Sequence, residues 1–290
     1  MGYQGDIRSS DIQALADRVS RGTYQKYLRR IRLSRVRAFT DREVSLDFPV
    51  TAIVGPNGGG KTTILGAAGL AYKKVQPRRF FAKSGKYDAS MQNWQIEYDI
   101  TDLSIQRASI QRTASFRQAK WNRDALPRDV LIFGVTRTVP ASERRDLIKA
   151  LGAKFTASAE EELAIEVVKA AEWVLGKKLD GFSRLSVDRQ GRVTMLSAKT
   201  PAGDYSEFHF GAGEASIIKM ISGIESANDN SLILIEEIEN GLHPVATRRM
   251  VEYLLDVAKR KSVQVLFTTH SNEALDPLPS SAIWAAYSGE

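Results

Sequence analysis

The stretch AIVGPNGGGKTT, residues 52–63, combines residue types that bind phosphate groups. Its glycines accept positive φ and carry no Cβ, so backbone N–H groups can close around a phosphate. Lys61 can then reach the β- and γ-phosphates of a nucleotide, and the Thr62 hydroxyl can ligate Mg²⁺. The residues predicted to bind nucleotide are Gly55, Pro56, Asn57, Gly58, Gly59, Gly60, Lys61, Thr62 and Thr63.

The segments on either side of this loop have the character that it needs. Val50–Val54 is apolar and predicts a buried parallel strand, and Ile64–Ala71 predicts a helix. The positive end of that helix would point at the same anion. A glycine-rich turn that matches by chance is the alternative, and the order of strand, loop and helix argues against it.

Two adjacent carboxylates, Glu236 and Glu237, follow a second apolar run in SLILIEEIENGLHP, residues 231–244. The run predicts a central strand that delivers both acids to the edge of the sheet where phosphate binds. Glu236 would hold the Mg²⁺ water shell, and Glu237 would orient or deprotonate an attacking water. A strand that simply ends in solvated charges is the alternative.

Two weaker signals accompany these motifs. VQVLFTTHS, residues 263–271, predicts a strand with His270 at its carboxyl end, where a histidine could contact a γ-phosphate or be merely structural. The other signal is a helix that runs to about Ile224 and whose first turn offers free N–H groups to a phosphate. The residues predicted to bind there are Gly211, Ala212, Gly213 and Glu214.

The composition is that of an ordinary globular protein of 290 residues, with 43% hydrophobic and 26% charged residues. No cysteine is present, which excludes disulfides and thiolate metal sites. No apolar run approaches membrane-spanning length, and the amino terminus has neither secretory nor transit-peptide character. We therefore expect a cytoplasmic protein without a membrane segment.

The formal net charge is +7, and the basic excess lies mostly in the first half of the chain. Such patches can contact nucleic acid or an acidic protein, although charged surface strands look the same in sequence. One cluster comprises Lys73, Lys74, Arg78, Arg79, Lys83 and Lys86. A looser second cluster comprises Arg107, Arg112, Arg117, Lys120, Arg123 and Arg128.

The rest of the chain alternates between helical and strand patterns. The other predicted helices are Ser10–Arg21, Ser142–Leu151 and Ser158–Leu175, the last with a capping box from Ser158 to Glu161. The other predicted strands are Tyr27–Val36, Val44–Phe48, Trp94–Thr101, Leu103–Arg112, Val130–Val135, Leu185–Val187, Arg192–Leu196 and one within Ala282–Tyr287. Turns are expected at TDRE, residues 40–43, and at DRQG, residues 188–191.

These elements predict one α/β domain over residues 1–290. We expect a core lobe at about 25–76 and 206–290, with a β and helical insert at about 77–205. Arg137 would lie at the carboxyl end of a strand, where α/β proteins collect ligands, so a functional role and a surface salt bridge both stay open.

The order of GPNGGGKTT, FGAGE, LILIEEIENGLHP and TTHS resembles that of the ATP-binding-cassette (ABC) ATPases. Within that group it is similar to the heads of the SMC, RecF and overcoming-lysogenization-defect (OLD) type. The resemblance covers nearly the whole chain and includes the hairpin sequence before the first motif. It implies a P-loop NTPase fold of the ABC-ATPase head type, with a mixed central sheet, an antiparallel β layer and a short helical insert.

Residue by residue, the resemblance makes Gly55–Thr62 a Walker A loop, Glu236 and Glu237 the Walker B acid and catalytic glutamate, and His270 the switch histidine. Asn240–Pro244 resembles the D-loop, and Phe210–Glu214 resembles the signature loop that acts on ATP held by a second subunit. The implied assembly is a head-to-tail homodimer, or a higher homo-oligomer, with ATP and Mg²⁺ between protomers.

Two departures from the family pattern affect the expected rate of hydrolysis. Glu236 stands where the family has an aspartate, which changes the Mg²⁺ geometry, and Gly211 stands where it has the signature serine. ATP binding is expected to survive both changes, whereas turnover is expected to be slow. The family's Q-loop glutamine has no certain counterpart, and Arg137 and Gln92 are the candidates.

The leading functional hypothesis is an ATP-driven switch of bacterial anti-phage defence that controls a separate effector. Residues 77–205 are too short for the long coiled coils of SMC proteins, and no acidic nuclease domain follows His270. A RecF-like repair ATPase that contacts DNA through the basic insert is one alternative, and a non-hydrolysing ATP-bound assembly module is another. A metabolite kinase would not need FGAGE or TTHS.

Overall fold

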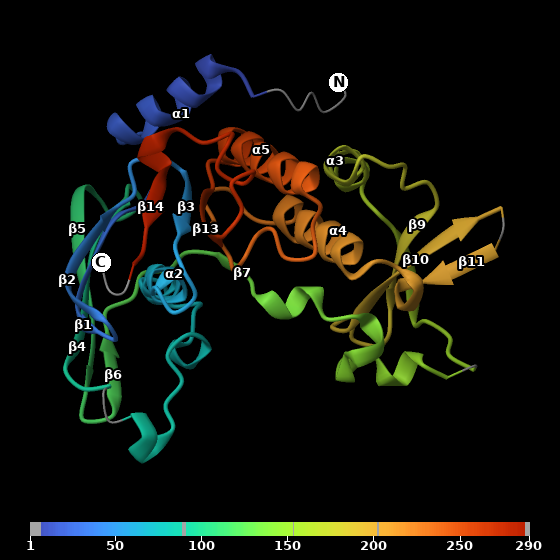
Figure 1. The fold of residues 1–290 in the computed structure, drawn as a ribbon, viewed down its shortest axis with the longest axis horizontal. Helices are drawn as coiled ribbons and strands as arrows, with labels where there is room; N and C mark the ends of the chain where they lie inside the picture. The colour runs from blue at the N-terminus through green and yellow to red at the C-terminus, as the bar shows by residue number, and fades with distance from the viewer. Residues whose placement is uncertain (1–6, 89–90, 153, 202, 288–290) are drawn as a thin grey trace. The chain divides into compact units, whose positions relative to one another are not determined.

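A computed structural model describes residues 7–88, 91–152, 154–201 and 203–287 of the chain (Figure 1). The described residues form two compact units. We call Gly134–Ser226 with Glu239–Tyr253 the GAGE unit, and the rest of the described chain the P-loop unit. The expected division into a core lobe and an insert at 77–205 stays a prediction.

A five-stranded parallel sheet forms the centre of the P-loop unit. Its strand order is β14-β3-β13-β12-β7, and each pairing is parallel. The strands are β3 (Val50–Val54), β7 (Val130–Phe133), β12 (Leu232–Ile235), β13 (Gln264–Thr269) and β14 (Ile283–Ala285). The continuous apolar runs of β3, β12 and β13 are buried almost throughout, as in strands covered on both faces. The predicted strands before the phosphate loop, the acid pair and His270 are therefore confirmed, and all three end at the same edge.

An antiparallel sheet forms a second layer of the P-loop unit, with strand order β2-β1-β4-β5-β6. The strands are β1 (Lys26–Val36), β2 (Phe39–Ser45), β4 (Trp94–Asp102), β5 (Gln106–Arg117) and β6 (Lys120–Arg123). Helix α2 (Lys61–Leu70) packs on β1 and β13, so its apolar face is buried between the layers. The mixture of parallel and antiparallel strands thus arises from two separate sheets in this unit.

The turn predicted at TDRE is wrong, because residues 40–43 lie inside β2. The hairpin instead turns between β1 and β2, where Arg35 and Arg37 adopt positive φ of 55° and 53°. Non-glycine residues rarely adopt this conformation, so their sequence gave no turn signal. The turn places Arg37 and Phe39 beside the phosphate loop.

Gln264 joins the two sheets of the P-loop unit at a bulge in β1. Its Nε2 donates to the Leu28 carbonyl (2.8 Å), and its Oε1 accepts from the Leu28 N–H (2.9 Å) and from Arg128 Nη1 (3.0 Å). The side chain is fully buried. A single amide therefore satisfies both backbone groups of Leu28, which lies beyond the residues of β1 that pair with β2.

Helix α1 (Ser9–Ser20) packs near the end of α5 (Pro244–Lys261). Arg18 Nη2 donates to Ser262 Oγ (2.7 Å), and Lys259 pairs with Asp11 (2.7 Å). Leu15 and Val19, spaced one turn apart, are buried. The predicted first helix is confirmed. Among the described residues, no helix has the length and apolar character needed to cross a membrane.

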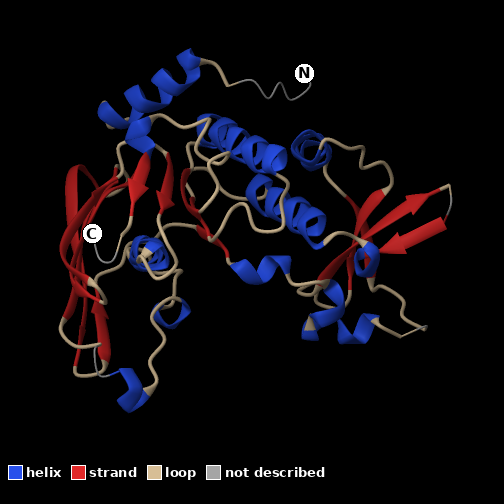
Figure 2. Ribbon diagram, in the orientation of Figure 1, coloured by secondary structure: helices blue, strands red, loops and turns tan. Residues whose placement is uncertain are grey.

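The GAGE unit contains a four-stranded antiparallel sheet in the order β11-β10-β9-β8, together with packed helices α3 and α4 (Figure 2). The bounds are β8 (Ala159–Glu162), α3 (Ile165–Leu175), β9 (Phe182–Ser186), β10 (Thr194–Thr200), β11 (Gly203–Ser206) and α4 (Ala212–Glu225). The 3-10 turns of this unit include η3 (Val135–Thr138), η4 (Ala141–Glu143), η5 (Arg145–Ala150) and η6 (Glu207–His209).

The single helix predicted over Ser158–Leu175 is wrong, since Ala159–Glu162 forms strand β8 and the helix begins at Ile165. Ser158 does not cap a helix. Its hydroxyl donates to the carbonyls of Ser186 (3.1 Å) and Asp188 (2.8 Å), which belong to the neighbouring hairpin. Tertiary hydrogen bonds therefore override a local capping pattern.

Three other predictions for the GAGE unit had mixed outcomes. Ser142–Leu151 is helical, but as the 3-10 turns η4 and η5 rather than one α-helix. The hairpin around DRQG is confirmed, because β9 and β10 pair in antiparallel fashion. The predicted helix after the GAGE sequence is also confirmed as α4.

Candidate nucleotide-binding site

The loop between β3 and α2 has a backbone that only glycines adopt readily. Gly55, Gly58 and Gly60 have φ of 143°, 78° and 104°. A Cβ on Gly60 would lie 2.5 Å from Phe39 Cζ, and one on Gly55 would lie 2.0 Å from the Ala286 carbonyl oxygen. Close packing from both sides therefore fixes the loop, and the N-terminus of α2 begins directly after it.

A pocket of 320 Å³ opens on this loop within the P-loop unit. The pocket is lined by the glycine loop, the β1–β2 hairpin, β13 and Glu237, which follows β12. The lining residues are Arg37, Ala38, Phe39, Asn57, Gly58, Gly59, Gly60, Lys61, Thr62, Thr63, Glu237 and Thr268. The size and the backbone N–H groups suit the phosphates of a nucleotide.

Lys61 and His270, which lie 209 positions apart in sequence, meet at this site. Lys61 Nζ donates to the carbonyls of Gly55 (2.8 Å) and Pro56 (3.0 Å) and lies 2.9 Å from His270 Nε2. An ammonium can only donate, so Nε2 accepts and the ring proton lies on Nδ1. The lysine is 7% exposed, and its charge is held inside the loop that would bind phosphate.

Glu237 lines the pocket with its backbone in the left-handed region, at φ 45°. Its N–H donates to Thr268 Oγ1 (2.8 Å), and the next N–H, of Ile238, donates to the Thr268 carbonyl (3.0 Å). Such a conformation costs about 1–3 kcal/mol in a non-glycine residue and persists only where neighbours hold it. The structure thus turns the chain sharply at the residue predicted to activate water.

Glu236 occupies a different position from Glu237. Its N–H donates to the Phe133 carbonyl (2.9 Å), which continues the β12–β7 ladder, and its side chain is half-buried outside the described pocket lining. Thr62 lies in the first turn of α2 and lines the pocket. Among the described residues, no group of three or more His, Asp or Glu side chains is arranged to hold a metal. One hydroxyl and carboxylate oxygens fit Mg²⁺ when phosphate oxygens and water complete the coordination.

Arg37 and Thr268 are pocket residues that sequence reasoning missed. Arg37 Nη1 donates to Thr63 Oγ1 (2.9 Å), its Nη2 donates to the Phe80 carbonyl (3.0 Å), and the guanidinium lies 5.3 Å from the Phe81 ring centroid. Burial lowers the pKa of this guanidinium. For Arg37, the sequence signal was its place in a basic hairpin directly before the glycine loop. For Thr268, the signal was its place in the TTHS sequence, which did not assign it a role.

The GAGE loop (Gly211–Glu214) lies in the GAGE unit. Gly211 is the N-cap of α4, and a Cβ there would meet no atom within 4 Å. A Cβ on Gly213 would lie 1.8 Å from the Gly241 carbonyl oxygen, so the loop packs backbone to backbone on the D-loop region. Glu214 pairs with Lys177 (2.6 Å), which makes it an anchor of the loop.

The two basic clusters differ in what their side chains contact. In the second cluster, Arg128 is 6% exposed and donates to Tyr72 Oη (2.9 Å), and Arg112 pairs with Asp124 (3.0 Å). Both arginines therefore support the fold. In the first cluster, four exposed cations lie on or beside the 3-10 turns η1 (Pro77–Arg79) and η2 (Gly85–Asp88). These cations are Arg78, Arg79, Lys83 and Lys86. One of them, Lys86, has its Nζ 5.2 Å from the ring centroid of Tyr87, which is 82% exposed.

Solved structures of SMC and RecF proteins share this fold. The SMC head domain from Thermotoga maritima matches with a TM-score of 0.52 and 14% identity, and the match covers 87% of this chain and 92% of that chain. An Smc head bound to the C-winged helix domain of ScpA matches at 0.58 and 14%, with the same coverage. The recombination mediator protein RecF with ATP matches at 0.51 and 12%, over 92% of this chain and 99% of that chain. The expected α/β fold of a P-loop ATPase is thereby confirmed.

Family comparisons agree with the fold. None of the curated proteins matches the sequence. Residues 179–276, which include Glu237 and His270, match a family described as "AAA domain, putative AbiEii toxin, Type IV TA system". Residues 30–199, which include the phosphate loop, match a family described as "AAA domain". Because this second match spans more than half of the 290 residues, the chain belongs to the AAA domain family.

Proposed function

We propose that the protein is an ATP-hydrolysing molecular switch that dimerises head-to-tail around ATP, acts in the cytoplasm and controls a separate effector in anti-phage defence. The observation that carries the ATPase part is the convergence of Lys61, Glu237 and His270 on one glycine-built loop. The three residues come from the ends of three adjacent parallel strands or the helix that follows them. Such convergence is the arrangement that phosphoryl transfer requires.

Binding of ATP would use the loop backbone and the start of α2. The N–H groups of Gly58–Thr62 and the positive end of the helix would surround the phosphates. Lys61 would exchange its bonds to the Gly55 and Pro56 carbonyls for phosphate oxygens. Thr62 and Glu236 are the residues that would hold Mg²⁺, and the bound ion would neutralise charge on the phosphate oxygens.

Hydrolysis would depend on Glu237 and His270. The Glu237 carboxylate would orient a water molecule and accept its proton, and the imidazole of His270 would contact the γ-phosphate. The sharp turn at Glu237 would fix where this carboxylate acts. Turnover is expected to be slow, because Gly211 offers no hydroxyl to the nucleotide of a second copy.

In the proposed dimer, the GAGE unit would contact the nucleotide held by the other copy. A Cβ built on Gly211 would meet no atom of the described residues within 4 Å, and this space at the N-terminus of α4 would receive a phosphate of a nucleotide held by another copy. The match of residues 179–276 to a family described as a putative toxin supports the control of an effector in defence.

The experiment that tests the ATPase proposal compares Lys61→Ala with Lys73→Ala, an exposed lysine after α2. Fluorescent ATP binding and phosphate release would be measured with Mg²⁺ on both variants and on the wild type. Lys61→Ala is expected to lose binding at least tenfold, while Lys73→Ala keeps wild-type values. Unchanged binding in Lys61→Ala would show that the pocket does not hold the phosphates.

A second candidate function is direct DNA contact by a RecF-like ATPase. The observation in its favour is the run of exposed cations from Arg78 to Lys86 together with the exposed ring of Tyr87, since an exposed aromatic ring beside a cation can stack on a base. Reversal of charge in Arg79→Glu/Lys86→Glu is expected to weaken binding to single-stranded DNA and to reduce its salt dependence. Lys149→Glu/Lys169→Glu, on exposed lysines of the GAGE unit, is the control. Equal effects of the two pairs would remove this candidate.

A further inference from the structure

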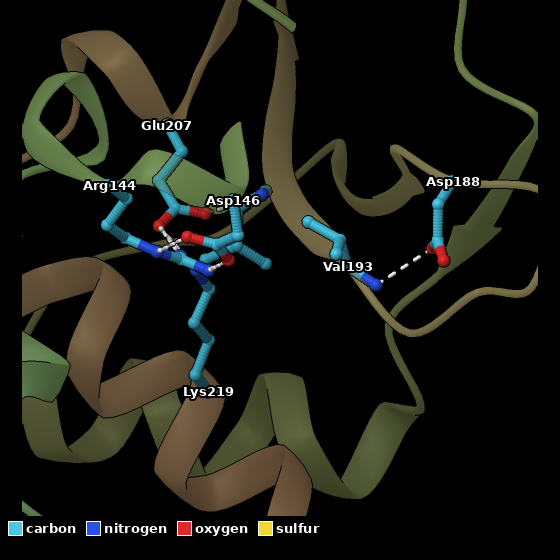
Figure 3. Close-up of polar contacts among 7 residues, drawn as sticks. Arg144, Asp146, Asp188, Val193, Glu207 and Lys219 are labelled. Carbon is cyan, nitrogen blue, oxygen red and sulfur yellow. Dashed lines mark hydrogen bonds and ion pairs between the residues drawn. The ribbon is translucent and has the colours of Figure 1, made fainter. Parts of the chain in front are cut away.

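Glu207 begins the 3-10 turn η6, four positions before Gly211 in the GAGE unit. Its side chain is buried, with 6% of the residue exposed. One carboxylate oxygen, Oε2, accepts the N–H of Leu196 in β10 (2.8 Å). The other, Oε1, lies 3.3 Å from Arg144 Nη1 and accepts a hydrogen bond from Lys219 Nζ (Figure 3).

The cations around Glu207 come from two different elements. Arg144 lies between η4 and η5 and also binds Asp146, so its guanidinium is shared by two carboxylates. Lys219 lies on α4 and follows the GAGE loop in sequence, whereas Glu207 precedes it. Burial lowers the pKa of the Lys219 ammonium, while the Glu207 carboxylate acts in the opposite direction. Two carboxylates thus balance two cations.

The Glu207–Lys219 contact connects the two ends of the chain segment that carries the GAGE loop. Glu207 precedes the loop in sequence and Lys219 follows it. The hydrogen bond from the Leu196 N–H to Glu207 links this pair to β10. Inside the segment, the Phe210 ring packs 5.2 Å from Phe182 and 5.0 Å from Tyr205, measured between centroids. The loop conformation is therefore held at both ends and in the middle.

A buried ion cluster contributes little to the stability of the fold, because desolvation offsets most of the attraction between the charges. Such a cluster can still fix the conformation of the segments that carry it, because each buried charged group is satisfied in few arrangements of its partners. The cluster lies next to the GAGE loop, since Gly211, the N-cap of α4, comes four residues after Glu207. We propose that Glu207 is a positioning residue that holds the GAGE loop in the conformation that receives ATP bound by a second copy of the chain.

This inference rests on the proposed function, because it assigns Glu207 to the trans contact of the ATP-bound dimer. Its test is Glu207→Gln in the full chain, which keeps the acceptor for Leu196 and removes the charge that Lys219 and Arg144 bind. The matched control is Asp188→Asn. Asp188 is another carboxylate of this unit that accepts a backbone N–H, from Val193 (2.8 Å), but it makes no described contact with the GAGE segment.

Four quantities would be measured for both variants: the thermal midpoint, fluorescent ATP affinity, ATP-dependent dimer formation and phosphate release. ATP affinity is expected to stay within twofold of wild type in both, because the P-loop unit is untouched. Dimer formation and kcat are expected to fall at least tenfold in Glu207→Gln alone. Lys219→Gln, whose amide can still donate to Glu207, is expected to show the same loss to a smaller extent.

Several outcomes would overturn the inference. If Glu207→Gln and Asp188→Asn lower turnover equally, or if turnover only follows the thermal midpoint, Glu207 has a purely structural role. If Glu207→Gln does not fold, Lys219→Gln decides, and wild-type dimerisation and kcat in that variant would contradict the inference. A wild-type protein that neither dimerises with ATP nor releases phosphate would instead overturn the proposed function, and this inference with it.

Discussion

The hydroxyl of Thr268 helps to hold the backbone of Glu237, a residue that lines the pocket. The Glu237 backbone lies at positive φ, and its N–H is bonded to Thr268 Oγ1 (2.8 Å). Without that acceptor, the strained conformation loses one of the contacts that hold it. The position of the carboxylate in the pocket therefore depends on a threonine that does not itself act on water.

Thr268→Val is expected to lower kcat about tenfold or more while ATP affinity stays within twofold. The change also leaves a part-buried N–H without its acceptor, which is expected to lower the free energy of unfolding by about 1–3 kcal/mol. Phosphate release, fluorescent ATP binding and urea unfolding would measure the three quantities. Thr268→Ser, which keeps the hydroxyl, is the control and should retain kcat. Loss of kcat in both variants would point to the methyl group.

At the scale of elements, Gln264 joins the parallel and antiparallel sheets of the P-loop unit. Its amide satisfies both backbone groups of Leu28 at the β1 bulge and also accepts from Arg128. Gln264→Leu keeps the volume but removes these partners from fully buried groups. The free energy of unfolding is expected to fall by about 2–4 kcal/mol, because each unsatisfied buried group costs about 1–3 kcal/mol.

Urea unfolding monitored by tryptophan fluorescence would measure the effect of Gln264→Leu. Gln95→Leu on β4, whose half-buried amide donates to the nearby Glu97 side chain, is the matched control and is expected to change stability little. Equal effects of the two substitutions would mean that Gln264 does not connect the sheets in the way described.

The elements that sequence predicted best were those with strong local patterns. The strands Val50–Val54 and Leu232–Ile235 and helix α4 were recovered, because buried apolar runs and glycine-bounded helices carry their own signal. Strand β8 was missed because AEEE is exposed on all four residues and pairs at an edge, where only the neighbouring strand β9 defines it. Such a strand has no apolar alternation to detect.

The same distinction applies to the candidate site. The glycine loop and the acid pair have spacing that sequence can show, whereas Arg37 and Thr268 enter the pocket through tertiary packing. The positive φ values at Arg37 and Glu237 are likewise set by neighbours and not by residue type. Sequence therefore predicted which groups come together at the glycine loop but not what holds them in place.

At the scale of the whole molecule, carboxylates in both units are expected to make stability depend on pH. Hydrogen bonds from Asn228 and Lys74 lower the pKa of Asp129, and the Leu179 N–H lowers that of Glu172. A carboxylate with a lowered folded pKa adds stability above its unfolded pKa, near 4, and this stability is lost as the pH falls through the folded value. Urea unfolding is therefore expected to show lower stability at pH 3 than at pH 6.

Glu172→Gln would test this pH dependence of stability at a single carboxylate. The variant is expected to be less stable than wild type at pH 6, and the difference is expected to shrink as the pH falls towards 3, because the wild-type carboxylate takes up a proton as the pH falls through its folded pKa. Glu166→Gln, on an exposed residue of the same helix α3, is the control and should follow the wild-type curve. A difference between Glu172→Gln and wild type that does not vary with pH would contradict the assignment.

The central claim is a switch in which ATP closes a dimer and hydrolysis opens it. The most direct measurement is the mass of the protein in solution, by light scattering, with ATP and Mg²⁺ for wild type and Glu237→Gln, with phosphate release followed in the same samples. The account predicts an ATP-dependent dimer that Glu237→Gln traps, and phosphate release only from wild type. A mass that is the same with and without ATP in both proteins, with no phosphate release, would contradict it.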